Sequence, residues 1–378
     1  MIKRSFVYLN LKIAMVFLSY LFSCSSNTDY KTSSSDFFEL GIENVILDTM
    51  NLAIDSLTTI PENSQLIRND SVFFFYNKSN LSLEFYHRFD SISFNRVFLE
   101  SEGPNGLSGM NGVYYISNDT IIGSRVNELI LFNIKGKIYK RIKLNLDGLG
   151  SFPDLMIQGT KPIVFFEDKL IISIFPHLNP NNKSHLENWK SFVEIDLNSG
   201  IAKSFGELPQ VMKDFVFGIN YLNFSFVKNS EDELIISFAP INDLFSIDLN
   251  DPDRNLDRII LKDPNFNSAP PLSDPKNSDM QYVLSHYLFN NSFDAIYYNG
   301  TNYIRIIQKP ISEDEFNSMS WAKRKVMIWY DLNFVPVLSH DLNSRSLSYN
   351  MVYPLDSAFI SRVSSSMEDS FQFVLFKN

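Results

Sequence analysis

Residues 112–144, GVYYISNDTIIGSRVNELILFNIKGKIYKRIKL, carry the clearest strand pattern in this chain. Four short apolar or aromatic runs follow one another in this stretch: Val113–Ile116, Thr120–Gly123, Glu128–Asn133 and Ile138–Ile142. The residues between the first and second runs, and between the third and fourth runs, favour tight hairpin turns. A meander of four antiparallel strands is one blade of a β-propeller. We therefore predict that residues 112–144 form one blade.

The same order of four runs recurs along the chain. Complete sets lie at residues 65–100, 163–205, 223–261 and 295–340. A last set has only three runs: Met351–Leu355, Ala358–Arg362 and Phe371–Phe376. One unpaired run near the start, Ile42–Leu47, would complete that set and remove an exposed sheet edge. The pattern predicts an all-β, six-bladed propeller closed by an N-terminal strand, with seven blades as the alternative.

The N-terminus has the pattern of an export signal. Lys3 and Arg4 precede an apolar run, Ile13–Leu18, which is too short to span a bilayer comfortably. The run leads to Cys24, the only cysteine of the 378 residues, and Leu21-Phe22-Ser23-Cys24 resembles the lipobox of bacterial lipoproteins. We predict a signal peptide at residues 1–23, a lipidated Cys24 with a flexible tether at residues 24–40, and one propeller domain at residues 41–378. The protein would be exported and held by its lipid in the bacterial cell envelope, at the outer membrane.

The layout of the chain also resembles a known group of proteins. The loop Glu102-Gly103-Pro104-Asn105-Gly106, followed by a blade that ends in Leu131-Phe132-Asn133-Ile134-Lys135-Gly136-Lys137, is similar to the six-bladed, TolB-like propeller lipoproteins of Bacteroidota. Several families of that group are domains of unknown function. The resemblance implies the fold and the envelope location, and it transfers no catalytic residue.

Composition and motifs exclude several classes of function. The formal net charge is −10 and no basic stripe occurs, which argues against nucleic-acid binding. The chain contains no Gly-x-Ser-x-Gly elbow, no Cys–His pair and no phosphate-binding glycine loop. His177 and His185 share one insertion, but their spacing matches no helical zinc pair. We therefore assign no cofactor, no metal and no catalytic residue from the sequence.

Loop lengths point to one working face. In a blade, the connection between the second and third strands and the connection to the next blade lie on the same face. We expect these connections to be long, as at residues 101–110, 147–161, 176–190, 207–218, 263–294 and 309–324. Long loops grouped on a rigid scaffold commonly carry binding sites. The candidate ligand-binding residues on these loops are Glu102, Asn105, Asp154, His177, Trp189, Asp214, Tyr282, His286, Trp321 and Arg324.

The aromatic residues of these loops allow two interpretations. Phe152, Trp189, Phe215, Phe266, Tyr282, Tyr287, Phe316 and Trp321 could form a recognition surface, or each could anchor its loop to the scaffold. Anchoring is the simpler expectation for any one of them, and several exposed together would indicate recognition.

Two functional hypotheses follow. The first is a non-enzymatic binding or scaffolding lipoprotein that recognises a peptide, protein or glycan through its long-loop face. The alternative is a metal-dependent propeller hydrolase or lactonase with a divalent cation in the central channel. The alternative requires that oxygen-bearing side chains such as Glu102, Asn105, Asp154 and Asp214 converge at the mouth of the channel.

Overall fold

The computed structural model describes residues 39–41, 46–54, 64–67, 71–88, 94–144, 153–261, 266–276, 279–342, 347–355, 358–363 and 370–377. They lie in one compact unit, which spans Phe38–Asn378. The predicted signal peptide, Cys24 and nearly all of the predicted tether lie outside the described residues. Within the described part of the chain, no helix is long and apolar enough to cross a membrane.

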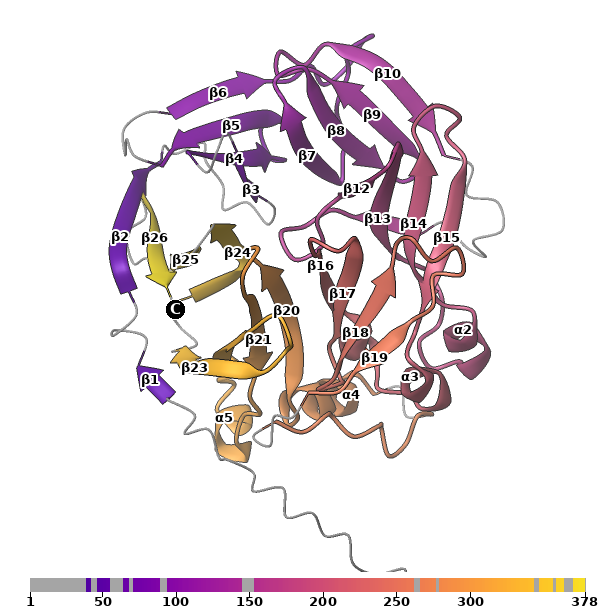
Figure 1. Ribbon diagram of the computed structural model, residues 1–378, viewed down its shortest axis with the longest axis vertical. Coiled ribbons are helices and arrows are strands. Elements are labelled where there is room, and N and C mark those ends of the chain that lie inside the picture. The colour runs from indigo at the N-terminus through magenta and orange to yellow at the C-terminus, as the bar shows by residue number, and fades with distance from the viewer. Residues whose placement is uncertain are drawn as a thin grey trace, which may run out of the picture. The chain divides into compact units, whose positions relative to one another are not determined.

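Six small sheets form the blades of a six-bladed propeller (Figure 1), as the repeated four-strand pattern predicts. Blade 1 contains β3 (Ser64–Ile67), β4 (Val72–Asn77), β5 (Ser82–His87) and β6 (Phe94–Phe98). Blade 2 contains β7 (Gly112–Ser117), β8 (Thr120–Arg125), β9 (Glu128–Phe132) and β10 (Ile138–Lys143). All neighbouring strands within these two blades are antiparallel.

Blade 3 differs from the prediction in its innermost strand. This position is shared by β11 (Asp154–Met156) and β12 (Val164–Phe166), which pair with the two ends of β13 (Lys169–Phe175). The sheet continues with β14 (Lys190–Asp196) and β15 (Ala202–Glu207). Residues 154–156, which the sequence placed in a loop between blades, are therefore part of a strand. A run of three residues is too short to show a strand period.

Blades 4 and 5 match their predicted strand sets. Blade 4 contains β16 (Phe224–Lys228), β17 (Glu233–Phe238), β18 (Leu244–Asp248) and β19 (Asp257–Ile259). Blade 5 contains β20 (Ser292–Tyr298), β21 (Tyr303–Gln308), β22 (Lys325–Tyr330) and β23 (Pro336–Leu342). A short strand that the sequence did not reveal, β1 (Glu39–Gly41), pairs in parallel with β23 and makes blade 5 five-stranded.

Blade 6 is closed by an N-terminal strand, as predicted, although this strand lies further along the chain. Its own strands are β24 (Leu347–Leu355), β25 (Ala358–Val363) and β26 (Ser370–Lys377). The fourth strand is β2 (Ile46–Ala53), which pairs antiparallel with β26 from Ile46↔Phe376 to Ala53↔Ser370. The predicted strand, Ile42–Leu47, overlaps β2 at its last two residues, and residues 42–45 lie outside the described residues. The rest of β2 was missed because residues 48–53, Asp-Thr-Met-Asn-Leu-Ala, mix polar and apolar side chains.

Hydrophobic clusters fill the spaces between neighbouring blades. β4 shows the principle, because Phe74 packs in the cluster shared with blade 2 while Phe73 and Phe75 pack in the cluster shared with blade 6. Successive side chains of a strand point to opposite faces, so a central strand between two blades is apolar at nearly every position. This explains why the central strands were readable as short continuous apolar runs.

Polar side chains connect several pairs of neighbouring blades. Gln65 of blade 1 accepts from Tyr115 N (2.6 Å) and donates to Tyr115 O (3.3 Å) in blade 2. Lys140 Nζ of blade 2 donates to Leu197 O beside blade 3 (2.6 Å). Arg305 of blade 5, with no exposed surface, donates to Ile241 O of blade 4 (2.9 Å). These bonds tie successive blades to one another in addition to the apolar packing.

Candidate functional site

All described helices lie in connections on one face of the propeller. Because strands of a meander alternate in direction, connections between second and third strands and connections between blades leave from the same end of the strands. Four short α-helices and one 3₁₀ helix occur there: α2 (Lys183–Glu187), α3 (Gln210–Asp214), η2 (Ile219–Leu222), α4 (Met280–Leu288) and α5 (Glu313–Asn317). Figure 1 shows the labelled α-helices along the side of the ring formed by blades 3, 4 and 5.

The expectation of long connections holds for only part of this face. The second-to-third connections of blades 3 and 5 are long, at residues 176–189 and 309–324. Those of blades 1, 2 and 4 are tight turns at residues 78–81, 126–127 and 239–243, so the prediction was too broad. The connection between blades 1 and 2, residues 99–111, is long as predicted, but the described helices are confined to a sector over blades 3–5. We call it the helical sector (residues 176–189, 208–223, 266–276, 279–291 and 309–324).

Side-chain caps define the helices of this sector. Asn182 accepts from Ser184 N at the start of α2, and Asp279 accepts from Gln281 N at the start of α4. Ser312 and Glu315 form a reciprocal capping box on α5. The helices are five to nine residues long, too short for a 3.6-residue period to appear in the sequence.

Several predicted site residues serve to anchor their loops. Trp189 is 1% exposed and packs edge-on against Phe175 at 5.3 Å, so its side chain is not available to a partner. Asn105 Oδ1 accepts from Ile138 N (3.2 Å), and the Tyr282 hydroxyl accepts from Asp274 N (2.9 Å). His286 packs edge-on against Tyr221 (5.6 Å), and burial lowers the pKa of its imidazole.

The remaining predicted residues lie at the surface. Asp154 Oδ2 and His177 Nε2 are 3.0 Å apart, and the structure thus brings together the first residue of β11 and a residue of the β13–β14 connection. Asp214 accepts from Gln210 Nε2 (3.0 Å), while Glu102 and Arg324 are exposed. Trp321 is 45% exposed, stacks on Phe316 at 6.0 Å and lies near the 79% exposed Met319.

The aromatic residues of the long loops therefore divide between the two interpretations. Trp189 and Phe266 are buried, and Tyr282 and Tyr287 pack partly against the core. Phe215, at 52% exposed, and Trp321 remain open on the helical sector. Phe152 lies outside the described residues.

A metal-dependent enzyme would need several metal-ligating side chains close together. Among the described residues, no group of three or more His, Cys, Asp or Glu side chains lies close enough to hold a metal ion. His177 is paired with Asp154, and His185 Nδ1 accepts from Asn179 N (2.9 Å). The described side chains thus give the hydrolase hypothesis no ligand set.

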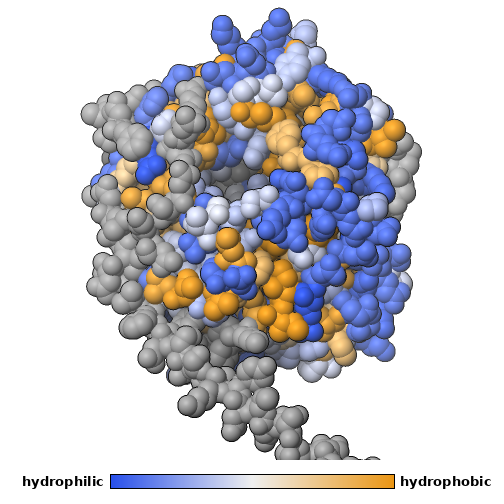
Figure 2. Space-filling model, viewed as in Figure 1, coloured by the Kyte–Doolittle hydropathy of each residue, from blue (hydrophilic) through white to orange (hydrophobic). Residues whose placement is uncertain are grey.

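A cleft of about 960 Å³ lies between blades 3 and 4. Its apolar floor includes Phe205, Leu208, Ile241 and Phe245, each less than 9% exposed. A continuous run, residues 203–211, lines one side, and the turn at residues 252–256 lines another. The volume falls within the range of ligand pockets. Figure 2 shows hydrophilic residues gathered over the right-hand side of the ring, where Figure 1 places these two blades.

The net charge of the side chains that line this cleft is positive, opposite in sign to the net charge of the whole chain. Six basic side chains and three acidic ones line it, in a protein whose formal net charge is −10. Glu207 is shared by Lys190 (2.7 Å) and Lys213 (2.5 Å), which hold the pKa of its carboxyl at about 2. Each carboxylate that is shared by two cations leaves one positive charge unbalanced.

A second shared carboxylate occupies the other end of the cleft. Glu194 accepts from Lys169 Nζ and from Arg254 Nη2, both at 2.9 Å. Arg254 reaches across from the β18–β19 turn and lies over the rings of Phe166 (5.3 Å) and Phe205 (5.6 Å). Lys203 lies directly opposite Glu194 on β15, and its exposed side chain has no hydrogen bond or ion pair to any described residue.

A buried polar cluster lies under the helical sector in blade 5. Asp294 accepts from Gln308 Nε2 and from Ser292 Oγ (3.3 Å), and burial raises the pKa of its carboxyl. Lys323 Nζ donates to Tyr287 O (3.0 Å) and Asn290 O (2.5 Å). Burial lowers the pKa of Lys323 to about 8. These bonds hold the end of the α5 loop against the end of α4.

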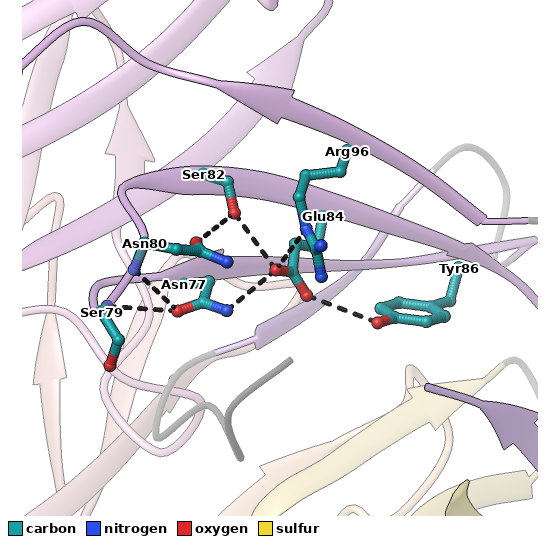
Figure 3. Close-up of polar contacts among 7 residues, drawn as sticks. All are labelled: Asn77, Ser79, Asn80, Ser82, Glu84, Tyr86 and Arg96. Atoms are coloured by element: carbon teal, nitrogen blue, oxygen red, sulfur yellow. Dashed lines mark hydrogen bonds and ion pairs between the residues drawn. The ribbon is translucent and has the colours of Figure 1, made fainter. Parts of the chain in front are cut away.

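Glu84 shows how blade 1 satisfies a buried carboxylate (Figure 3). It is 1% exposed and accepts from Asn77 Nδ2 (2.9 Å), Ser82 Oγ (3.1 Å) and Arg96 Nε (3.0 Å). The Tyr86 hydroxyl donates to its other oxygen at 3.4 Å. With its oxygens occupied, Glu84 orders the end of the blade and is not free for a ligand.

No feature of the sequence predicts the cleft as a whole. Its cations come from β13, β14, β15, α3 and the β18–β19 turn, so no local motif marks them. The only signal was the alternation of β15, in which Lys203 and Phe205 share one face of the strand.

Comparison with known proteins is consistent with this architecture. A family model described as "Domain of unknown function (DUF4221)" matches residues 34–330. The crystal structure of a DUF4221 family member from Bacteroides vulgatus superposes with a TM-score of 0.73 at 16% identity, covering 88% of this chain and 97% of that one. A candidate exported protein from Bacteroides fragilis superposes with a TM-score of 0.55 at 10% identity, covering 90% and 98%. No curated protein matches the chain.

Proposed function

The chain belongs to the DUF4221 family, and on that premise we propose that it is a non-enzymatic binding propeller, anchored by a lipid on Cys24 in the bacterial cell envelope, at the outer membrane. Its ligand is a peptide, protein or glycan, which it recognises through the helical sector. The observation that carries the proposal is the restriction of all described helices to one face over blades 3–5, where α3 lines part of the cleft between blades 3 and 4.

The chemistry of the sector supports recognition. Phe215, Met319 and Trp321 are 45–79% exposed on connections that are otherwise well anchored. Large apolar side chains that stay exposed on a rigid support are typical of binding surfaces, because a partner can bury them without ordering a loop. Anchors such as Trp189 and Lys323 supply that rigidity.

Export and lipid attachment rest on the N-terminal pattern. The apolar run Ile13–Leu18 and the position of Cys24 support cleavage by a lipoprotein signal peptidase. A structurally similar protein from Bacteroides fragilis is named as a candidate exported protein, which agrees with this location.

Affinity capture tests the proposal. The full-length lipidated protein is used as bait in solubilised native envelope, beside a variant carrying Met319→Ser and Trp321→Ser. A matched control carries Leu332→Ser and Val335→Ser, two apolar residues that are 55% and 51% exposed on the opposite face of blade 5. We expect a stoichiometric partner with the wild type and the control, and its loss with the first variant. Equal capture by all three proteins would refute recognition through the helical sector.

A further inference from the structure

We propose that the cleft between blades 3 and 4 binds an extended acidic peptide, which pairs with the edge of β15 as an additional strand. This inference rests on the proposed binding function and names its ligand class and site. The peptide carries two carboxylates four residues apart with an apolar residue midway between them. The cleft, its charge and the sheet edge each support one part of this description.

The outer edge of β15 faces the cleft. Residues 203–208 line it without a break, whereas side chains of one strand face alone would line it at every second residue. Asp196 N donates to Ile201 O, and β14 and β15 keep one register from there through Glu194↔Lys203. Hydrogen-bonded pairs alternate along antiparallel strands, so the amide and carbonyl of Ser204 point away from β14. They are available to an added strand.

The molecule already contains such an addition. On blade 5, β1 pairs along the outer edge of β23, with Glu39↔Ser339, Leu40↔His340 and Gly41↔Asp341. The outer edge of a blade in this fold therefore accepts an extra short strand. Strand addition supplies affinity through the backbone, and side-chain pockets supply specificity.

The cations set the spacing of the two acidic side chains. Lys190 lies opposite Glu207, and Lys203 lies opposite Glu194, so the two positive regions are separated along β15 by four residues. In an extended chain, four residues span about 13 Å, and the side chains at both ends point to the same face. One carboxylate would meet Lys190 and Lys213, and the other would meet Lys169 and Lys203.

The apolar floor of the cleft determines which type of residue lies between the two carboxylates of the peptide. Phe205 and Phe245 are 8% and 5% exposed, and they lie between the two cationic ends. The middle side chain of the peptide, two residues from each carboxylate, points to this floor. An aliphatic side chain such as leucine would cover it.

Fluorescence anisotropy with the full-length protein in detergent tests this site. The probe is a labelled nine-residue peptide with glutamate at its third and seventh positions, leucine at its fifth and threonine elsewhere. We expect saturable binding that weakens at least tenfold when both glutamates are replaced by glutamine. N-methylation of alternate backbone amides, which removes strand pairing but keeps the charges, should weaken binding at least fivefold.

Protein variants locate the site. Lys203→Glu and Lys213→Glu should each weaken binding at least tenfold. Lys203→Glu places a second carboxylate opposite Glu194, so thermal denaturation must first show that this variant is folded. Lys135→Glu, an equal charge change in an exposed turn of blade 2, should change binding less than twofold. An unchanged affinity with Lys203→Glu, or with the N-methylated peptide, would overturn the strand-pairing site.

The outcomes also separate this inference from the proposed function. If oligogalacturonate binds as well as the peptide and displaces it, the cleft recognises anionic glycans and the peptide assignment is wrong. If neither probe binds while envelope capture still depends on Met319 and Trp321, the cleft inference fails and the proposed function stands. If the peptide binds and envelope capture does not depend on Met319 and Trp321, the cleft inference stands and recognition through the helical sector fails.

Discussion

At the scale of single residues, the buried charges of this protein are held by neighbours on adjacent blades. Lys161 is 3% exposed, donates to Asn223 Oδ1 (2.8 Å) and lies over the ring of Phe224 at 5.0 Å. Arg305 lies over Phe293 at 4.3 Å and bonds to the backbone of blade 4. Removing one partner from such a contact leaves a polar group unsatisfied, so these residues fix the geometry of the ring.

Lys161 gives a pH-dependent prediction. Burial lowers its pKa from 10.5 to about 8. Below pH 8 the lysine is protonated in both states, and the cost of burying its charge is fully present. Between pH 8 and 10.5 the unfolded chain holds more protons than the folded one, so the stability contribution of this group rises with pH. Relative to Lys161→Met, the wild type should gain about 1–3 kcal/mol in free energy of unfolding from pH 8 to 10.

Urea unfolding at pH 7, 8, 9 and 10 measures this difference. Lys135→Met, at an exposed position, should follow the wild type at every pH. If the wild-type and Lys161→Met curves run parallel across this range, the lysine is not buried as described.

Cys24 gives the prediction for the anchor. Cys24→Ala should abolish incorporation of labelled palmitate and release the protein from the membrane fraction, because no other thiol is present in the chain. Undiminished palmitate labelling of that variant would rule out lipidation at this position.

At the scale of elements, the sequence predicted best where a strand is buried on both faces. β8, β13, β17 and β21 appear as apolar runs because neighbouring blades cover them from both sides. β1 and β11, of three residues each, and the short helices carry too few residues for a period. The predicted bounds of β2 were several residues too early, because this strand at the edge of the sheet mixes polar and apolar residues.

Ring closure by β2 gives the first prediction for an element. Deletion through Gly41 removes β1 together with the residues before it and leaves β2 in place. The β23 edge then resembles the uncovered edges of other blades, so the loss of stability should be small. Deletion through Ala53 also removes β2 and exposes β26 along the register from Ile46 to Ala53. That variant should aggregate or lose at least 10 °C in Tm, because it presents an open apolar edge. Thermal denaturation with light scattering compares the two, and equal Tm values would contradict closure by β2.

Trp189 and Trp321, the two tryptophans of the long connections, give the second prediction at the scale of elements. Trp189→Ala should destabilise the protein by about 3–5 kcal/mol, since it leaves a cavity beside Phe175 in the core between blades 3 and 4. Trp321→Ala, at a 45% exposed position, should cost less than about 1 kcal/mol. Chemical denaturation measures both, and similar losses would show that Trp321 is an anchor as well.

At the scale of the whole molecule, the six blades form a regular ring, but the described helices and the additional strand β1 are distributed unevenly around it. Blades 1 and 2 have tight turns where blades 3 and 5 carry helices, and the chain adds β1 to blade 5. The sequence predicted a long-loop face because loop lengths can be counted along the chain. It could not predict the cleft, whose walls combine residues from Lys169 to Arg258 that meet only after two blades pack together.

Site-specific photo-crosslinking in living cells tests the central claim most directly. A benzoylphenylalanine is placed at Met319 on the helical sector or at Leu332 on the opposite face of blade 5, both exposed. We predict that ultraviolet light yields one discrete envelope adduct from position 319 and none from position 332. Adducts from position 332 alone, or from neither position, would contradict a binding role for the helical sector.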